Sequence, residues 1–194
     1  NQFLKLLCRI PRPWVLDPDF TIVESARAEA TGYSFPSGHT QNAVGTFGGI
    51  ARATKRHCLR WVCVVIFVLV SFSRMYLGVH TPLDVGVSFV IAAVLVFAIY
   101  PLMRRADRYP RLMAGLLASM VLLSAAYLTF TLVYPFPPDI DSANLASGVE
   151  NGWKLLGATL GIALAWWLDR QYVRFETKAV WWVQVIKFIV GLAL

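Results

Sequence analysis

Residues 83–103, LDVGVSFVIAAVLVFAIYPLM, carry one charged side chain, Asp84, and it stands at the start of the run. About 20 apolar residues in a helix cross the hydrocarbon core of a bilayer. A second long apolar run covers residues 112–134, and shorter runs cover residues 61–72, 153–168 and 179–194. Because hydrophobic residues make up 57% of the chain and charged residues 15%, against about 25% in soluble domains, the sequence predicts an all-α, polytopic membrane helical bundle.

The first part of the chain is more mixed in composition. Prolines interrupt residues 11–18 and a polar stretch follows, so residues 1–36 are predicted to be a loop with one short helix at 24–30. Ser37 is typical of an N-cap, and a helix of small residues is expected from there to about residue 52. Gly45, Gly48 and Gly49 predict that its backbone approaches neighbouring helices closely.

The connecting segments alternate in charge along the chain. The first, third and fifth loops are basic, whereas the segment 135–150 has no Lys or Arg and holds Asp139, Asp141 and Glu150. Since basic loops face the cytoplasm, we expect the segments that end in His39 and His80 to lie on the extracytoplasmic side, whether periplasmic, extracellular or lumenal. The net charge of +7 forms no single basic stripe, so no nucleic-acid partner is expected.

Cysteine and carboxylate spacing gives no sign of a bound metal or cofactor. Cys8, Cys58 and Cys63 show no zinc-type spacing, and they are predicted to be free buried or interfacial thiols. No cluster of acidic residues resembles a metal site. We therefore expect chemistry that needs neither a metal nor a cofactor.

Two histidines and one carboxylate lie at positions suited to phosphoryl transfer. His80 can attack phosphorus if one ring nitrogen is unprotonated, and Asp84, in the first turn of a helix expected to begin near Pro82, can accept from the other nitrogen. His39 can protonate the leaving oxygen and later activate water. These residues are predicted to be the catalytic group.

Several further residues have the character of a phosphate cradle. Ser37 and Gly38 open a helix, where backbone N–H groups and the helix dipole favour an anion. Arg12 and Arg74 can bind phosphate oxygens in a bidentate manner, and Lys5 adds a point charge. In place of a metal ion, these cations would neutralise the charge of the phosphoryl group.

Three short motifs give the chain a family resemblance. They read Lys5 to Arg12-Pro13 (K-x6-RP), Pro36-Ser37-Gly38-His39 (PSGH) and Ser73-Arg74 to His80 to Asp84 (SR-x5-H-x3-D). The chain resembles the type 2 phosphatidic acid phosphatase (PAP2) superfamily of membrane lipid phosphatases. The resemblance implies a six-helix core with an extracytoplasmic site, in which His80 is the nucleophile, Asp84 its partner and His39 the acid; Lys5, Arg12, Ser37, Gly38 and Arg74 would bind phosphate.

The chain departs from that family pattern at both ends. Membrane helices are expected before the first motif, so residues 1–103 would be part of a catalytic core whose N-terminal helices are missing here. Residues 104–194 would supply the remaining core helix and additional C-terminal membrane helices, which either pack on the core or form a homodimer contact. The acidic segment 135–150 is interpreted as a solvated connector rather than as the rim of a lipid entrance.

The resulting hypothesis is an integral membrane lipid phosphatase that works through a phosphohistidine without metal. Expected substrates are phosphatidic acid, phosphatidylglycerol phosphate, undecaprenyl pyrophosphate or sphingoid base phosphates, and membrane lipids would surround the protein. A phosphotransferase that passes the phosphoryl group to an alcohol or sugar needs the same residues, so the motifs leave it open. A sugar-phosphate substrate and a non-catalytic membrane transporter also remain as alternatives, although no catalytic position of the motifs is degraded.

Overall fold

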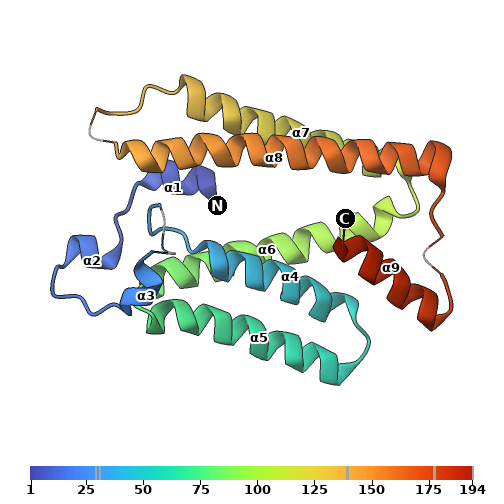
Figure 1. Ribbon diagram of the computed structural model, residues 1–194, viewed down its shortest axis with the longest axis horizontal. Helices are drawn as coiled ribbons and strands as arrows, with labels where there is room; N and C mark the ends of the chain where they lie inside the picture. Colours follow the sequence, from blue (N-terminus) through green and yellow to red (C-terminus); the bar gives the residue numbers. More distant parts are fainter. Residues whose placement is uncertain (29, 31, 139, 177, 194) are drawn as a thin grey trace.

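The computed structural model describes residues 1–28, 30, 32–138, 140–176 and 178–193, and these residues form helices and loops without any strand. Helices α4 (Gly38–Ala53), α5 (His57–Tyr76) and α6 (Pro82–Ala106) pack together as one group. Helices α7 (Pro110–Val133) and α8 (Ser142–Leu168) form an antiparallel pair beside this group (Figure 1). The prediction of an all-α bundle is therefore confirmed.

Shorter elements gather at the two ends of the bundle. Helices α1 (Gln2–Cys8), α2 (Pro13–Leu16) and α3 (Glu24–Arg27) lie at one end, and α1 packs against α8 (Figure 1). At the other end α8 continues into the π-helix η1 (Asp169–Val173), and α9 (Trp181–Ala193) follows. The short helix predicted at 24–30 ends at Arg27, and Glu29 lies outside the described residues.

In the part of the chain that the structure describes, three helices are long and apolar enough to cross a membrane by length and composition, namely α5, α6 and α7. Large apolar side chains on them point outward, among them Trp61, Phe97 and Leu122, which are 67%, 64% and 69% exposed. Exposed apolar surface of this extent is stable against lipid rather than water. The helices at 61–72, 83–103 and 112–134 were each predicted, and the first is longer than its apolar run because flanking residues extend it at both ends.

Helix α8 corrects one prediction. The acidic segment 135–150 is not simply a connector, because residues 142–150 are the first turns of α8. The carboxylate of Asp141 accepts hydrogen bonds from the backbone N–H groups of Ala143 and Asn144, at 2.8 and 3.2 Å. This N-cap starts the helix eleven residues before the apolar run at 153. Asp139, also part of the acidic segment, lies outside the described residues, as does Leu194 at the end of the last predicted run.

The glycines that bring helices together are not the predicted ones. A Cβ placed at Gly48 would lie 3.9 Å from the Val96 side chain, but the same atom at Gly45 or Gly49 would meet nothing within 4 Å among the described residues. Close approach occurs instead on α8, where a Cβ at Gly152 would lie 3.0 Å from Cδ1 and 3.4 Å from Cα of Leu128 on α7. The α7–α8 contact therefore depends on a missing side chain at residue 152.

Polar contacts strengthen the same α7–α8 contact. The hydroxyl of Tyr127 donates to the carbonyl oxygen of Gly148 at 3.1 Å, and the hydroxyl oxygens of Ser124 and Thr159 lie 2.8 Å apart. Side-chain hydrogen bonds between apolar helices keep polar groups paired away from water. These contacts hold α8 in place, and α8 in turn carries residues to the end of the bundle where α1 lies.

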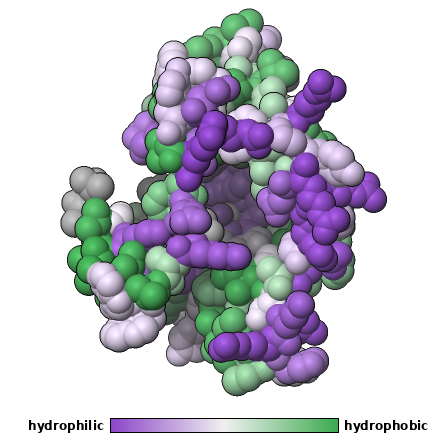
Figure 2. Space-filling view, turned by 90° about the vertical axis from the view of Figure 1, so that its right-hand side faces the viewer, coloured by the Kyte–Doolittle hydropathy of each residue, from purple (hydrophilic) through white to green (hydrophobic). Residues whose placement is uncertain are grey.

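The charged loops separate along the long axis of the bundle. Figure 2 views the end that holds the predicted basic loops, and hydrophilic side chains surround a central hollow there. The basic residues of these loops are Arg52, Lys55, Arg56, Arg60, Arg104, Arg105, Arg108, Arg111, Arg170, Arg174 and Lys178. His39 lies in the first turn of α4 and His80 lies just before α6, and both of these helices begin at the opposite end of the bundle (Figure 1). The three cysteines are free, as predicted, and Cys63 is buried, whereas Cys8 and Cys58 are exposed.

Replacing Gly152 with leucine tests the close contact between α7 and α8. The new side chain has no room beside Leu128, and overpacking of this kind costs about 1–3 kcal/mol. We expect the midpoint of thermal unfolding in detergent to fall by a few degrees. Gly157→Leu is the matched control, because Gly157 lies on the same helix with nothing within 4 Å of its Cβ position. Equal midpoints for the two variants would show that the contact is not tight.

Candidate active site

The turn between α5 and α6 carries His80 and depends on one glycine. Gly78 has φ of +72°, and a Cβ there would lie 2.6 Å from the carbonyl oxygen of Thr21 and 3.1 Å from Cα of Ile22. The segment before α3 therefore packs directly on this turn, and the backbone N–H of Val23 donates to the carbonyl oxygen of Leu77 at 3.2 Å. Only glycine fits both the left-handed backbone and the close neighbour. Gly78 was not among the predicted site residues, although a glycine inside the spacer of a motif was a usable signal.

Helix α6 begins where the sequence predicted, and its cap fixes Asp84. The hydroxyl of Thr81 accepts from the backbone N–H of Asp84 at 3.2 Å, and the carboxylate of Asp84 accepts from the backbone N–H of Thr81 at 2.9 Å. This reciprocal capping box holds the carboxylate in one orientation. Asp84 is 2% exposed, so its charge is almost fully removed from solvent.

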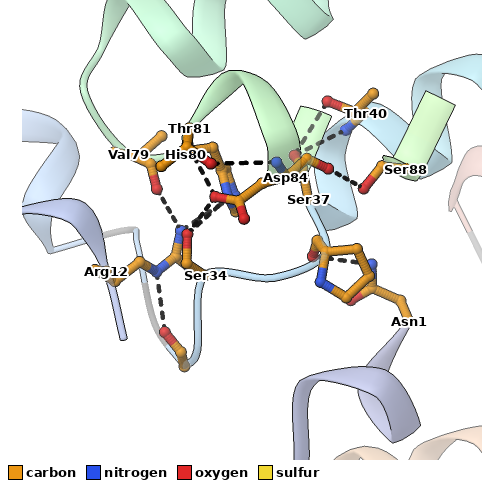
Figure 3. Close-up of polar contacts among 12 residues, drawn as sticks. Asn1, Arg12, Ser34, Ser37, Thr40, Val79, His80, Thr81, Asp84 and Ser88 are labelled. Carbon is orange, nitrogen blue, oxygen red and sulfur yellow. Dashed lines mark hydrogen bonds and ion pairs between the residues drawn. The ribbon is translucent and has the colours of Figure 1, made fainter. Parts of the chain in front are cut away.

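The same carboxylate oxygen meets the histidine and a serine. Oδ2 of Asp84 lies 3.4 Å from Nδ1 of His80, and the hydroxyl of Ser34 donates to this oxygen at 2.5 Å (Figure 3). Ser34 is completely buried. It was not predicted as a site residue, and its position two residues before the PSGH motif was the only hint. Three donors thus converge on one oxygen, which positions both the carboxylate and the imidazole.

The second ring nitrogen of His80 faces a guanidinium. Nε2 lies 3.1 Å from Nη1 of Arg12 (Figure 3). Because arginine only donates, Nε2 is the acceptor and carries no proton, so the proton is on Nδ1 and points to Asp84. Burial lowers the pKa of His80, with an opposing contribution from its hydrogen bond to Asp84. The geometry therefore gives a neutral imidazole with an available lone pair on Nε2.

Arg12 is held rigidly between two loops. Its Nε donates to the carbonyl oxygen of Gly32 at 3.0 Å, and its Nη1 donates to the carbonyl oxygen of Val79 at 2.8 Å (Figure 3). Burial lowers the pKa of Arg12 to about 10. The guanidinium stays charged at neutral pH, and its backbone contacts fix it beside Nε2 of His80.

Lys5 supplies a second buried cation from α1. Burial, followed by the charge of Arg12, lowers the pKa of Lys5 to about 8, and the charge of Asp84 acts in the opposite direction. Burial lowers the pKa of His39, and the positive charges of Arg74, Lys5 and Arg12 lower it further. These groups create a concentrated positive potential around the two histidines, which favours a multiply charged anion.

A cavity of about 850 Å³ brings most of the predicted residues together, and we call it the catalytic cavity. Asp84 lies behind His80, as the hydrogen bond between them requires. Helix α8 also lines this cavity through Asn151 and Leu155, neither of which was predicted as a site residue. The predicted site residues that line the cavity are Lys5, Arg12, Gly38, His39, Arg74 and His80.

Ser37 is the predicted site residue whose side chain lies elsewhere. Its hydroxyl oxygen accepts from the backbone N–H of Thr40 at 3.4 Å and from the Thr40 hydroxyl at 3.1 Å, and the residue is completely buried. Ser37 therefore caps α4, as predicted, and its hydroxyl does not line the catalytic cavity. The Ser37 cap holds the first turn of α4, which places Gly38 and His39 in the cavity wall.

Across the described ranges, no three His, Cys, Asp or Glu side chains gather as metal ligands would. The positive groups of the catalytic cavity are side chains, namely Lys5, Arg12 and Arg74.

A known protein family matches the part of the chain that carries the three motifs. Residues 1–108 match the PAP2 superfamily. The chain belongs to the PAP2 superfamily. Residues 153–194 match a second PAP2 description, the transmembrane extension of PAP2 superfamily phosphatases. The C-terminal helices that follow the motifs thus also have a counterpart among PAP2 proteins, whereas a division of the chain at residue 103 stays a prediction.

Curated relatives match over about half of the chain or less. The undecaprenyl-diphosphatase BcrC of Bacillus subtilis (strain 168) is 34% identical over 100 residues, 52% of this chain and 49% of that protein. Phosphatidylglycerophosphatase B of the same organism is 32% identical over 106 residues, 49% of this chain and 50% of that protein. An undecaprenyl-diphosphatase of Sulfolobus acidocaldarius is 43% identical over 56 residues, 28% of this chain and 26% of that protein. The chain spans about half the length of the first two relatives, and no solved structure matches it.

The pKa of Lys5 predicts how inorganic phosphate binds to this PAP2 chain as the pH changes. Lys5 loses its charge as the pH rises through about 8, so the affinity for phosphate should fall in that range, by up to about tenfold for the loss of one charge contact. In Lys5→Arg the guanidinium stays charged, and the affinity should be constant to about pH 10. The ionisation of phosphate itself changes with pH in the same way for both proteins. The difference between their phosphate affinities, measured by calorimetric titration at several pH values, therefore reports on Lys5 alone. Parallel curves would show that Lys5 does not contact the anion.

Proposed function

We propose that this protein is a lipid phosphatase that hydrolyses a phosphomonoester or pyrophosphate at the head of a membrane lipid through a phosphohistidine on His80. The observation that carries the proposal is the orientation of His80. Its Nδ1 is directed at Asp84 and its Nε2 at a cavity that holds His39 and three cations. The names of the relatives, undecaprenyl-diphosphatase and phosphatidylglycerophosphatase, support the same chemistry.

In the first step, the lone pair of Nε2 attacks phosphorus while the bond to the leaving oxygen breaks. A phosphoryl oxygen takes over the Arg12 donor that now lies 3.1 Å from Nε2, so the cation that holds the free nucleophile also binds the substrate. Nδ1 keeps its proton, and the carboxylate of Asp84 stabilises the positive charge that develops on the ring. Burial and the nearby cations lower the pKa of His39, and the negative charge of the bound phosphate opposes them, so that His39 is protonated and gives its proton to the leaving oxygen.

In the second step, water attacks the phosphorus of the phosphohistidine. His39, now neutral, accepts a proton from the water, the bond between phosphorus and Nε2 breaks, and inorganic phosphate leaves. Lys5, Arg12 and Arg74 stay fixed around the transferring group in both steps. Preorganised cations of this kind stabilise the charge on the equatorial oxygens without reorganisation, which is why no metal ion is needed in this scheme.

The proposal includes a side of the membrane. The catalytic cavity lies at the end of the bundle opposite the loops rich in arginine and lysine (Figures 1 and 2). Because such loops face the cytoplasm, the site would open on the extracytoplasmic side. Its substrates would be lipids whose phosphorylated head groups reach that surface, such as undecaprenyl pyrophosphate or phosphatidylglycerol phosphate.

Phosphate release from lipid phosphates in detergent with EDTA tests the scheme. We expect metal-independent release by the wild-type protein and a loss of at least about 1,000-fold in His80→Ala, since removal of a nucleophile costs about this much or more. His57→Ala is the control, because this exposed histidine begins α5 at the far end of the bundle. A requirement for magnesium, or robust release by His80→Ala, would contradict the phosphohistidine scheme. Transfer to added glycerol in place of release would identify a phosphotransferase.

Ser34→Ala tests whether the buried serine positions the carboxylate. The variant removes a donor to Asp84 without adding bulk, and a hydrogen bond to a charged group contributes about 1.5–3 kcal/mol. We expect kcat to fall about tenfold or more with KM unchanged, because Ser34 does not line the catalytic cavity. Ser119→Ala is the control. It removes an exposed hydroxyl that donates to the carbonyl oxygen of Leu116 in the same helix, so this variant should have wild-type kinetics. An increase in KM with constant kcat would mean that Ser34 affects substrate binding instead.

A further inference from the structure

An apolar cavity of about 350 Å³ runs along α4 and α6, and we call it the apolar groove. Gln41 lines both this groove and the catalytic cavity, so the two spaces meet at this side chain. Gln41 is half-buried and accepts a hydrogen bond from the side chain of Asn1 at 2.8 Å. The site of phosphoryl chemistry therefore continues into a hydrophobic space along the helix that carries His39.

The groove is open because α4 lacks side chains on one face. Gly45 and Gly49 follow Gln41 at intervals of four residues and share its face of the helix. A Cβ at either glycine would meet nothing within 4 Å. The opposite wall is aliphatic, with Leu95 and Ile99 of α6 remaining 46% and 45% exposed. Bare glycine on one side and uncovered aliphatic carbon on the other make a surface suited to a hydrocarbon chain.

The chemistry of the proposed reaction sets the direction in which that chain must run. Nucleophile and leaving oxygen lie roughly in line on opposite sides of phosphorus, so the leaving oxygen faces away from His80 and toward His39. His39 precedes Gln41 by two residues at the start of α4. The carbon chain, attached to the leaving oxygen directly in a monoester and through the inner phosphate in a pyrophosphate, thus begins near the mouth of the apolar groove.

We propose that the apolar groove binds the hydrocarbon chain next to the scissile bond and makes the protein selective for single-chain lipid phosphates or pyrophosphates over two-chain phospholipids. This inference rests on the proposed function. Gln41 to Gly49 spans about 12 Å of helix. A methylene group is similar in size to a water molecule, about 30 Å³, so the volume of about 350 Å³ accommodates roughly a dozen such groups. That is enough for the first part of one chain and too little for two chains side by side.

Filling the groove tests the proposal. Gly45→Leu and Gly49→Leu place a side chain on its floor, and Gly157→Leu is the control because Gly157 on α8 also has open space around it. Each variant is assayed with a long-chain polyprenyl pyrophosphate and with a five-carbon pyrophosphate too short to enter the groove. We expect kcat/KM for the long chain to fall about tenfold or more, through KM, and kcat/KM for the short one to stay within about twofold of wild type. The control should behave as wild type with both substrates.

Other results would overturn the inference. Equal losses with both substrates would mean that residues 45 and 49 affect the position of His39 rather than a lipid chain. Unchanged kinetics with both substrates would mean that the chain lies elsewhere. A change in oligomeric state without a change in chain preference would identify a second copy of the protein as the occupant. A diacyl phosphate hydrolysed by the wild-type protein as well as the polyprenyl substrate would contradict the proposed selectivity.

A binding measurement separates this inference from the proposed function. A long-chain alkyl phosphate with a photoreactive diazirine in its chain should label the α6 wall of the groove around Leu95 and Ile99, and Gly45→Leu should lose this label. If the wild-type protein releases no phosphate from any lipid but the α6 label appears, the phosphatase proposal fails and the chain site stands. If release is normal and the label lies on other helices, the groove inference fails alone.

Discussion

One carboxylate oxygen organises the site. Oδ2 of Asp84 accepts from the backbone N–H of Thr81, from the hydroxyl of Ser34 and from Nδ1 of His80. A buried charge without partners is strongly destabilising, whereas a fully hydrogen-bonded one is tolerated. The burial of Asp84 therefore brings two separate segments, residues 80–84 and the chain around Ser34, into one arrangement. The Asp84 carboxylate caps the start of α6, fixes Ser34 in the chain before α4, and accepts a hydrogen bond from Nδ1, which leaves Nε2 of His80 unprotonated.

Two further constraints make that arrangement rigid. Arg12 connects the carbonyl oxygens of Gly32 and Val79, and Gly78 lets the segment before α3 pack directly on the turn that carries His80. Arg12 and the imidazole of His80, the proposed nucleophile, are consequently positioned before any ligand arrives. A site built in this way binds the charge of a phosphoryl group without the cost of ordering its own side chains, which is why the same residues suit both steps of the proposed reaction.

The helices around the site have surfaces suited to a membrane. Apolar side chains cover the outside of α5, α6 and α7, and the basic loops lie at the end opposite the catalytic cavity. Helix α8 contributes Asn151 and Leu155 to the cavity, so the C-terminal half of the chain takes part in the site as well as in the bundle. The groove along α4 and α6 extends the polar cavity into apolar surroundings, as a lipid with a charged head group requires.

The sequence by itself determined the helical membrane fold, the capped start of α4, the start of α6 near Pro82, and the residues His39, His80, Asp84, Lys5, Arg12 and Arg74 as one chemical group. Apolar run length, caps and motif spacing are local properties, so they can be read from neighbouring residues. Only the tertiary structure decided that Ser34 contacts Asp84 across 50 residues of sequence, that α8 reaches the cavity, and that Gly45 and Gly49 face open space while Gly152 is tightly packed. Which side chains meet across such distances depends on how whole helices pack, and no local pattern records that packing.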